Sequence, residues 1–369
     1  MTTDSIKLIE SFEAKVPLPK PLNVGSTVIT YRSYTVVRVT TQDGIVGVGY
    51  AYSRGLPIKP ILDTMISPVA IGATAEDPNA VRKTILATYW HSAEHGTFSA
   101  AVSALDIALQ DIVGKRKGKS IAALLGATTR EIPIYSVIGY HYGEDESGLI
   151  EEIEYAQSRG VNSFKMVVGA QTPERDATRL AVTRAKVGEG VHIAVDAFRS
   201  FKTLENAVAR VNAIKGSTIS FVEDPFLESE GALAIALREI TGVPVSFGES
   251  QASSKMIEQV LHYNQVDVVR LDALIIGGVD EFMTAATAAY EKGVTVATHI
   301  HTEVHAQLAA AIPNLYPGGL EYLDPIYNID LFHLLIENPI EIRNGNAVVS
   351  DAPGFGIEWN WPAIYEFSK

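Results

Sequence analysis

The sequence contains no cysteine. This absence excludes disulfide bonds, thiolate metal sites and cysteine nucleophiles. Positive charge is also scarce, because 30 lysines and arginines stand against 43 aspartates and glutamates, for a net charge of −13. Binding to a nucleic-acid backbone rests on clustered positive charge, so we expect no nucleic-acid partner.

Long apolar runs are missing as well. No uninterrupted apolar stretch reaches the ~18 residues that a membrane helix needs, so we expect no membrane partner. The first residues, MTTDSIKLIE, show no basic segment followed by an apolar one, and we therefore expect a cytoplasmic protein. The chain does have length and apolar content. Its 369 residues, 47% of them hydrophobic, are enough for two domains with substantial cores.

The first third of the chain reads as strands followed by helices. In residues 5–53 apolar and polar residues alternate around Asp43-Gly44, a pair typical of a β-hairpin turn. Residues 58–125 change to helical spacing, and the last helix is expected to stop at Gly114 and Gly118. Strands and helices that do not alternate predict an α+β domain, which we place at residues 1–128.

From residue 129 onward, strands and helices are expected to alternate. Apolar runs begin near residues 132, 163, 191, 218, 244, 266, 294 and 319. Eight parallel strands close a TIM-type barrel, so residues 129–328 are predicted to form a (β/α)7β barrel with the α+β domain as its cap. Residues 329–369 do not continue the alternation, and we expect them to pack back on the first domain.

One polar residue stands at or near the end of most of these apolar runs. The intervals between them are 22 to 31 residues, which is about the length of one strand, one helix and two loops. Parallel strands that each present a polar residue at the carboxyl end match the active-site plan of a TIM barrel. The residues are Lys165, Asp196, Glu223, Glu249, Asp272, His299 and Glu321.

Three of these residues are predicted metal ligands. Asp196, Glu223 and Glu249 end three consecutive strands, and neighbouring parallel strands lie only about 4.8 Å apart. Three converging carboxylates would repel one another unless a cation lies between them. An all-oxygen site with open positions suits Mg²⁺, which we therefore predict as the cofactor.

The remaining four residues have the chemistry of acid–base catalysis. Asp272 beside His299 would orient the imidazole and make it a general base. Lys165 could face a substrate anion or carry a proton. Glu321 could donate a hydrogen bond to an enolate if burial keeps it protonated. His301 and His305, which follow His299, are expected to have structural roles.

These motifs resemble those of the enolase superfamily, mandelate racemase subgroup. The resemblance covers nearly the whole chain and is carried by FKMVVG, VDAFRS, FVEDP, FGES, LDALIIGG, ATHIH, GGLEYL and DAPGFGIEW. It implies an enzyme in which Mg²⁺ on the three carboxylates binds a substrate carboxylate. His299, oriented by Asp272, would move the proton α to that carboxylate, and Lys165, Glu321 and the metal would stabilise the ene-diolate. The resemblance also implies a homo-oligomer, either a dimer or an octamer.

One departure from the family pattern bears on the reaction. Racemases of this family carry a second lysine two residues after the first one, and here that position is Val167. Racemisation needs an acid–base group on both faces of the planar intermediate. The sequence therefore favours a one-base reaction, the syn dehydration of a sugar acid to a 2-keto-3-deoxy acid. Racemisation, epimerisation and cycloisomerisation remain the alternatives, with Lys165 as a second base if it is desolvated.

A second departure affects the edge of the site. Phe198 stands where many relatives place an asparagine, and Arg199 follows it. Arg199 would bind either a second anionic group of the substrate or a nearby acid outside the site. The resemblance also implies that specificity comes from capping-domain loops near Pro17–Asn23 and Tyr52–Pro57. The polar candidates there are Lys20, Tyr52 and Arg54, although each is expected to be an ordinary solvated loop residue.

Two other classes of function fit parts of the pattern. Two glutamates at the mouth of a TIM barrel could form a glycosidase pair, which would not depend on a metal. A non-catalytic binding protein could also keep the fold, and its ligand affinity would not depend on His299.

Overall fold

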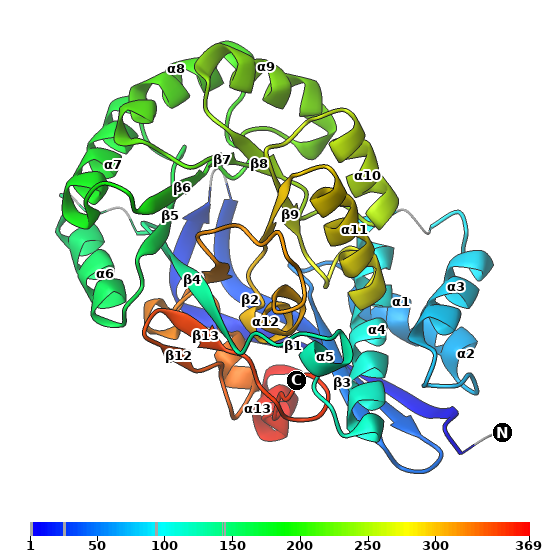
Figure 1. The fold of residues 1–369 in the computed structure, drawn as a ribbon. Coiled ribbons are helices and arrows are strands. Elements are labelled where there is room, and N and C mark those ends of the chain that lie inside the picture. The colour runs from blue at the N-terminus through cyan, green and yellow to red at the C-terminus, as the bar shows by residue number, and fades with distance from the viewer. Residues whose placement is uncertain (1–2, 25–26, 93–94, 142, 144) are drawn as a thin grey trace.

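A computed structural model describes residues 3–24, 27–92, 95–141, 143 and 145–369 (Figure 1). The N-terminal part begins with a three-stranded antiparallel sheet of β1 (Ile6–Val24), β2 (Thr27–Thr41) and β3 (Val46–Tyr52). The predicted hairpin at Asp43-Gly44 is confirmed, because β2 pairs with β3 across it and Gly44 has a φ of 87°. The segment Pro17–Asn23 is not a loop as expected. It belongs to β1, with an irregularity in pairing between Pro17 and Leu22.

Helix α4 (Gly96–Lys117) forms the core of this capping domain against the sheet. Gly47 and Gly49 of β3 allow the close approach, because a Cβ at Gly49 would lie 2.2 Å from the carbonyl oxygen of Ala104. The helix runs through Gly114, contrary to the expected stop, and ends at Gly118 with a φ of 61°. It is long and apolar enough to cross a membrane, but 83% of that apolar window is buried inside the protein. We therefore interpret α4 as the central helix of this domain. The other helical segments here are α1 (Ile58–Ile61), the π-helical turn Leu62–Ile66, α2 (Ser67–Ala70), α3 (Pro78–Thr88) and α5 (Ile121–Leu124).

The predicted eight-stranded parallel arrangement is confirmed. Strands pair in the order β10-β9-β8-β7-β6-β5-β4, and β11 pairs with the free side of β4. The recorded ladders of the described residues do not join β10 to β11, although Val296 forms a bridge with Leu315 beside them. The strands are β4 (Glu131–Ile138), β5 (Ser163–Val167), β6 (His192–Asp196), β7 (Val222–Glu223), β8 (Val245–Phe247), β9 (Val268–Leu271), β10 (Thr295–Thr298) and β11 (Leu320–Tyr322).

Helices form an outer layer around these strands (Figure 1). Each helix buries an apolar stripe against the sheet, as Leu180, Val211 and Ile257 illustrate. This packing holds the strands in place. Their carboxyl ends face the capping domain. The helices are α6 (Ser147–Ser158), α7 (Pro173–Val187), α8 (Leu204–Ile214), α9 (Gly231–Thr241), α10 (Ser254–His262), α11 (Val279–Glu291) and α12 (Thr302–Ala309).

The C-terminal segment contacts both parts of the chain. Its hairpin of β12 (Ile342–Arg343) and β13 (Asn346–Val348) adds an antiparallel strand to β4. Helix α13 (Trp361–Phe367) packs on β1, where the ring of Trp361 lies 5.7 Å from that of Phe12. Gly354 packs against Gly114, which explains why α4 has a glycine in its interior.

Candidate active site

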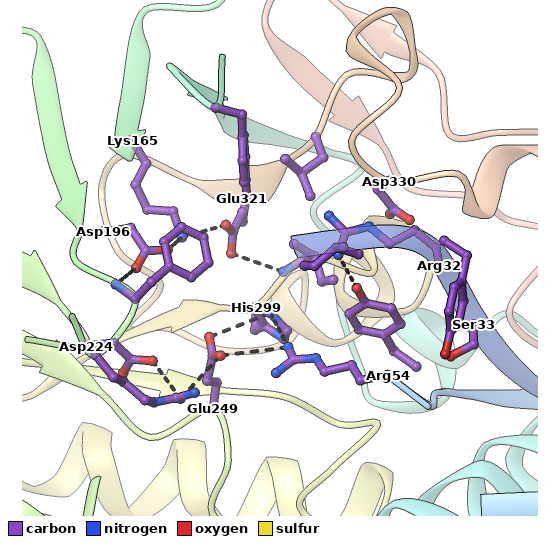
Figure 2. A pocket seen from close by; sticks show the side chains of 18 of the residues that line it. Arg32, Ser33, Arg54, Lys165, Asp196, Asp224, Glu249, His299, Glu321 and Asp330 are labelled. Atoms are coloured by element: carbon purple, nitrogen blue, oxygen red, sulfur yellow. Dashed lines mark hydrogen bonds and ion pairs between the residues drawn. The ribbon is translucent and has the colours of Figure 1, made fainter. Parts of the chain in front are cut away.

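A cavity of about 500 Å³ lies between the capping domain and the carboxyl ends of the barrel strands (Figure 2). Its volume lies within the range of small-molecule pockets. Five of the seven polar residues predicted from the sequence line it, and Glu223 and Asp272 lie directly behind them. The five that line it are Lys165, Asp196, Glu249, His299 and Glu321.

The three candidate metal ligands come from neighbouring strands. Asp196 and Glu223 are the last residues of β6 and β7, and they are direct partners in the parallel ladder between these strands. Glu249 follows two residues after the end of β8. Glu223 Oε2 is buried and accepts no hydrogen bond, although the Arg270 guanidinium lies 3.1 Å away. Strand register thus brings together three carboxylates whose oxygens are not all satisfied by the protein.

Lys165 lies in the middle of this acidic group. Its Nζ is 3.3 Å from Asp196 Oδ2, 2.7 Å from Glu223 Oε1 and 2.5 Å from Glu321 Oε1. Burial and the neighbouring Arg270 act to lower the pKa of Lys165. The three carboxylates outweigh them and raise this pKa well above its ordinary value. Lys165 is therefore held as an ammonium ion in this structure.

Arg270 is a part of the site that our sequence interpretation missed. It is completely buried in β9, and its guanidinium lies against Glu321, Glu223 and Glu249, with Nε 3.4 Å from Glu249 Oε2. The sequence held a signal for it. Arg270 is the only charged residue in the apolar strand VVRL, and it precedes Asp272 by two positions, which puts both side chains on one face.

Glu321 accepts hydrogen bonds rather than donating one. Burial acts to raise the pKa of its carboxyl, but Arg270 and Lys165 lower it to about 2. The amide N–H of Ile300 donates to its Oε2 at 3.1 Å. The condition under which Glu321 could donate a hydrogen bond, a carboxyl kept protonated by burial, is therefore not met in this structure, because Lys165 and Arg270 both contact it.

Asp272 and His299 form the predicted pair at the ends of β9 and β10. His299 Nδ1 lies 2.8 Å from Asp272 Oδ2, and the N–H of Leu274 donates to Asp272 Oδ1 at 2.8 Å. His299 Nε2 lies 3.2 Å from Nη2 of Arg54, a residue of the capping domain. A guanidinium can only donate, so Nε2 accepts and the imidazole proton is on Nδ1.

The charges around this pair favour a neutral imidazole. Burial, reinforced by Arg54, lowers the pKa of His299 well below its ordinary value. Burial raises the pKa of Asp272 to about 8, but the two donors that converge on its oxygens identify it as the accepting carboxylate. His299 is therefore arranged as a base whose Nε2 lone pair faces the cavity.

His305 holds the two strand ends that carry this pair. Its Nδ1–H donates to the carbonyl oxygen of Ile300 at 2.7 Å, and its Nε2 accepts from the N–H of Ala273 at 3.0 Å. These contacts confirm the structural role expected for His305. The neighbouring His301 stacks edge-on against Tyr50 at the start of α12.

Arg199 contacts acids of the site itself. Its Nη2 lies 2.6 Å from Asp224 Oδ2, 3.3 Å from Glu228 Oε1 and 3.4 Å from Glu249 Oε1. These carboxylates raise the pKa of Arg199 even though burial opposes them. The sequence offered two partners for Arg199, an anionic group of the substrate or an acid outside the site. Neither describes this contact fully, because one of the acids is the candidate metal ligand Glu249. Phe198 forms an apolar edge of the cavity with the ring of Tyr140, 6.0 Å away.

Backbone strain is concentrated around the cavity. Six non-glycine residues there have φ values between 27° and 57°, a region that L-residues rarely adopt. Each costs on the order of 1–3 kcal/mol, and such residues cluster where side chains must be aimed for function. They are Arg54, Phe198, Arg199, Asp224, Ile300 and His301.

A second group of potential ligand atoms lies beside the carboxylates. Atoms of Asp272, His299 and His301 lie within 4.8 Å of one another. Imidazole nitrogens suit transition metals, whereas Mg²⁺ prefers oxygen ligands. The oxygens of Asp272 already accept two hydrogen bonds. The group of Asp196, Glu223 and Glu249 is therefore the better candidate for Mg²⁺.

Two family profiles match the chain and together cover most of it. The profile described as "Mandelate racemase / muconate lactonizing enzyme, N-terminal domain" matches residues 8–126. The profile described as "Enolase C-terminal domain-like" matches residues 148–363. The chain belongs to the mandelate racemase/muconate lactonizing enzyme subgroup of the enolase superfamily. Its capping domain and barrel are the two domains of that family.

Characterised members of the subgroup include both lyases and isomerases. An L-talarate/galactarate dehydratase from Salmonella typhimurium is 28% identical over 96% of this chain and 89% of its own length. A D-galactarolactone cycloisomerase from Agrobacterium fabrum is also 28% identical, over 95% of both chains. The structure of an L-talarate dehydratase from Polaromonas sp. JS666 with Mg and L-glucarate has a TM-score of 0.89 at 23% identity, covering 99% of this chain and 97% of that one. This chain is accordingly an enolase-superfamily enzyme, a lyase or an isomerase.

Proposed function

We propose that this enzyme uses Mg²⁺ to remove the proton α to the carboxylate of a sugar acid, and then eliminates the β-hydroxyl to give a 2-keto-3-deoxy acid. One observation carries the choice of dehydration. Among the described residues that line the cavity, His299 is the one histidine, while Lys165 is held as an ammonium ion by three carboxylates. Val167, two residues after Lys165 on the same face of β5, cannot exchange a proton.

Asp196, Glu223 and Glu249 fit the metal that this reaction requires. They are buried oxygen donors from adjacent strands, and Glu223 Oε2 has no hydrogen-bond donor in the described structure. When bound there, Mg²⁺ would attract the substrate carboxylate and acidify the neighbouring C–H bond. The Mg-containing relative supports this choice.

His299 is proposed to perform both proton transfers. Its Nε2 lone pair accepts the α-proton, and the Asp272 carboxylate stabilises the resulting imidazolium through the Nδ1–H bond. The imidazolium then returns a proton to the departing β-hydroxyl on the same face, which yields water and an enol. The enol rearranges to the 2-keto acid. One group can serve both steps only if the proton and the hydroxyl leave from one face, so the elimination is syn.

Lys165 and Glu321 serve the charge that develops between these steps. The Lys165 ammonium stabilises the negative charge of the ene-diolate, an electrostatic contribution that is typically large in a buried site. Glu321 holds Lys165 in place and also anchors the Ile300 amide next to His299. Glu321 is therefore proposed as a positioning residue.

Deuterium exchange tests this function directly. The enzyme with Mg²⁺ is incubated with a panel of sugar acids in deuterated water, and NMR follows the α-proton and the products. We expect a 2-keto-3-deoxy acid from at least one substrate. Exchange with a diastereomer as product would identify a racemase or epimerase, and an isomer of unchanged mass would identify a cycloisomerase. Absence of both exchange and keto acid across the panel would refute the proposal.

The remaining alternatives separate by metal and mutation. Activity that survives a chelator would indicate a glycosidase. Ligand affinity and a biological effect that are both unchanged in His299→Ala would indicate a non-catalytic binding protein. We also propose that the protein is cytoplasmic and that it forms a homo-oligomer, a dimer or an octamer, the latter as the family resemblance implies. Light scattering on the purified protein would determine its size.

A further inference from the structure

The wall of the cavity that the capping domain contributes contains two arginines. Arg32 of β2 and Arg54, just after β3, both lie near Tyr52, with guanidinium carbons 5.7 Å and 5.0 Å from the centre of its ring. All three residues line the cavity. Figure 2 shows Arg32 across the cavity from Lys165 and Asp196, and Arg54 between Arg32 and Glu249. We call Arg32, Tyr52 and Arg54 the arginine wall.

Arg32 is held in place without a compensating anion. It is 8% exposed, its Nε donates to the carbonyl oxygen of Ile329 at 2.6 Å, and its Nη1 donates to the hydroxyl of Tyr52. Among the described residues, no carboxylate oxygen lies within 4.0 Å of a nitrogen of the Arg32 guanidinium, so Arg32 forms no ion pair with them. Buried charges in proteins are normally paired, because an unpaired one loses its hydration without compensation.

One acid of the cavity lining, Asp330, acts on Arg32, and one of its two oxygens is already engaged. Asp330 lies close enough to raise the pKa of Arg32, but burial and the tyrosine neighbours have larger effects. Asp330 Oδ1 accepts from the hydroxyl of Tyr34 and from the N–H of Phe332 at 3.1 Å. Arg32 therefore keeps its Nη2 donors available to a molecule in the cavity.

Arg54 adds further donors beside Arg32. In the described structure only its Nη2 has polar contacts, with His299 at 3.2 Å and with Glu249 at 3.8 Å. Its Nε and Nη1 donors have no recorded partner among these residues. The positive charges of Arg32 and Arg54, which both lie near the Tyr52 ring, repel each other. An anion bound by both guanidinium groups would relieve that repulsion. A carboxylate matches the fork of donors that an arginine presents.

We propose that Arg32 and Arg54 bind a second carboxylate, at the end of the substrate remote from the reacting carbon, so that the substrates are dicarboxylic sugar acids. This inference rests on the proposed function, which requires one carboxylate at Asp196, Glu223 and Glu249. The arginine wall then binds the other end of the molecule. The extended substrate places its α-carbon between the two ends, beside His299.

Matched pairs of substrates test this inference. Each pair has six carbons and the same hydroxyl configuration, and its members differ only in carrying a carboxylate or a hydroxymethyl group at C6. We expect kcat/KM for keto-acid formation to favour the diacid by roughly 10- to 100-fold, the value of a charge-assisted hydrogen bond in a buried site. Arg32→Met should reduce this diacid-to-monoacid ratio by about the same factor, and Arg32→Lys by less.

Controls separate recognition from folding. Arg38→Met, on the same strand but outside the cavity and paired with Glu10, should leave the ratio unchanged. If Arg32→Met fails to fold, Tyr52→Phe provides the test, because it removes the hydroxyl that orients Arg32. A ratio that stays constant in the folded variants, or a parent enzyme that prefers the monoacids, would overturn the inference.

A binding measurement distinguishes this inference from the proposed reaction. Calorimetry with Mg²⁺ present compares the affinity of the diacid and the monoacid for the parent enzyme and for Arg32→Met. Tighter diacid binding that is lost in the variant supports the arginine wall, even if no proton exchange occurs and the proposed reaction fails. Equal affinities for both acids would refute the arginine wall, whatever the reaction.

Discussion

Replacing Arg270 by methionine should destabilise the protein, and the loss should depend on pH and on Mg²⁺. The guanidinium is completely buried among three carboxylates, with contacts of 3.1 Å to Glu223 and 3.4 Å to Glu249 and a closer contact to Glu321. At an effective dielectric constant of about 20, one unit pair at 4 Å is worth about 4 kcal/mol before desolvation is subtracted. Leaving such carboxylates without their partner typically costs about 3–5 kcal/mol.

The sign of the pH dependence follows from the acids that Arg270 pairs. Arg270 helps to lower the pKa of Glu321 and of Glu249 to about 2, against the opposing effect of burial. A lowered pKa stabilises the fold above the unfolded pKa of about 4.3 and loses that effect as pH falls toward 2. The destabilisation of Arg270→Met relative to the parent should therefore be large at pH 7 and shrink as the pH falls toward 2, where these carboxylates become protonated in both proteins.

Chemical denaturation with a chelator present, at several values of pH, measures this difference. Added Mg²⁺ should stabilise Arg270→Met more than the parent, because the ion supplies positive charge to the same carboxylates. Arg184→Met is the matched control, since that buried arginine donates only to carbonyl oxygens such as those of Ser217 and Gly188. The loss of unfolding free energy in Arg184→Met should not vary with pH. A loss in Arg270→Met that is equally independent of pH would refute this reasoning.

Three shorter predictions address catalysis, the metal and packing. His299→Gln should lower keto-acid formation by about 10²- to 10⁴-fold while leaving Mg²⁺ affinity nearly unchanged, as kinetics and calorimetry would show; equal activity would remove His299 from the mechanism. A chelator should abolish activity and Mg²⁺ should restore it, whereas Glu223→Gln should raise the Mg²⁺ concentration needed; activity indifferent to chelation contradicts the metal site. Gly49→Ala should lower the unfolding free energy by roughly 1–3 kcal/mol, because its Cβ would lie 2.2 Å from the carbonyl oxygen of Ala104. Gly216→Ala, whose Cβ would have nothing within 4 Å, should be nearly neutral. Similar values for both variants would contradict the packing argument.

The sequence was most informative where a residue's position follows from strand periodicity. The barrel repeats a unit of one strand and one helix. A polar residue at the end of an apolar run can therefore be assigned to the carboxyl end of a strand without knowing its neighbours. This reasoning predicts the eight strands and the proximity of Lys165 and Asp196, both of which the structure shows. Such placement is possible because parallel strands share one direction and one edge.

The features that sequence reasoning missed depend on contacts between distant segments. The ionised state of Glu321 could not be predicted without Arg270, which comes from a strand 51 residues earlier. The exposure and partners of Arg32 depend on how the capping domain lies against Ile329, 297 positions away. The extent of β1 was missed because its proline-containing segment does not alternate like an ordinary strand.

The pairing of β4 has a consequence for how the protein is made. This first strand of the barrel is bonded to β11 through Ile134 and Leu320, and its opening residues are bonded to the tail through Ile132 and Ala347. A ribosome therefore releases the strand long before it synthesises these partners. The barrel cannot be completed until β11 has emerged, so we expect slow folding with exposed strand edges during translation. Removal of about the last thirty residues shown here would then leave β4 without its partner β13, and the chain would be prone to aggregate.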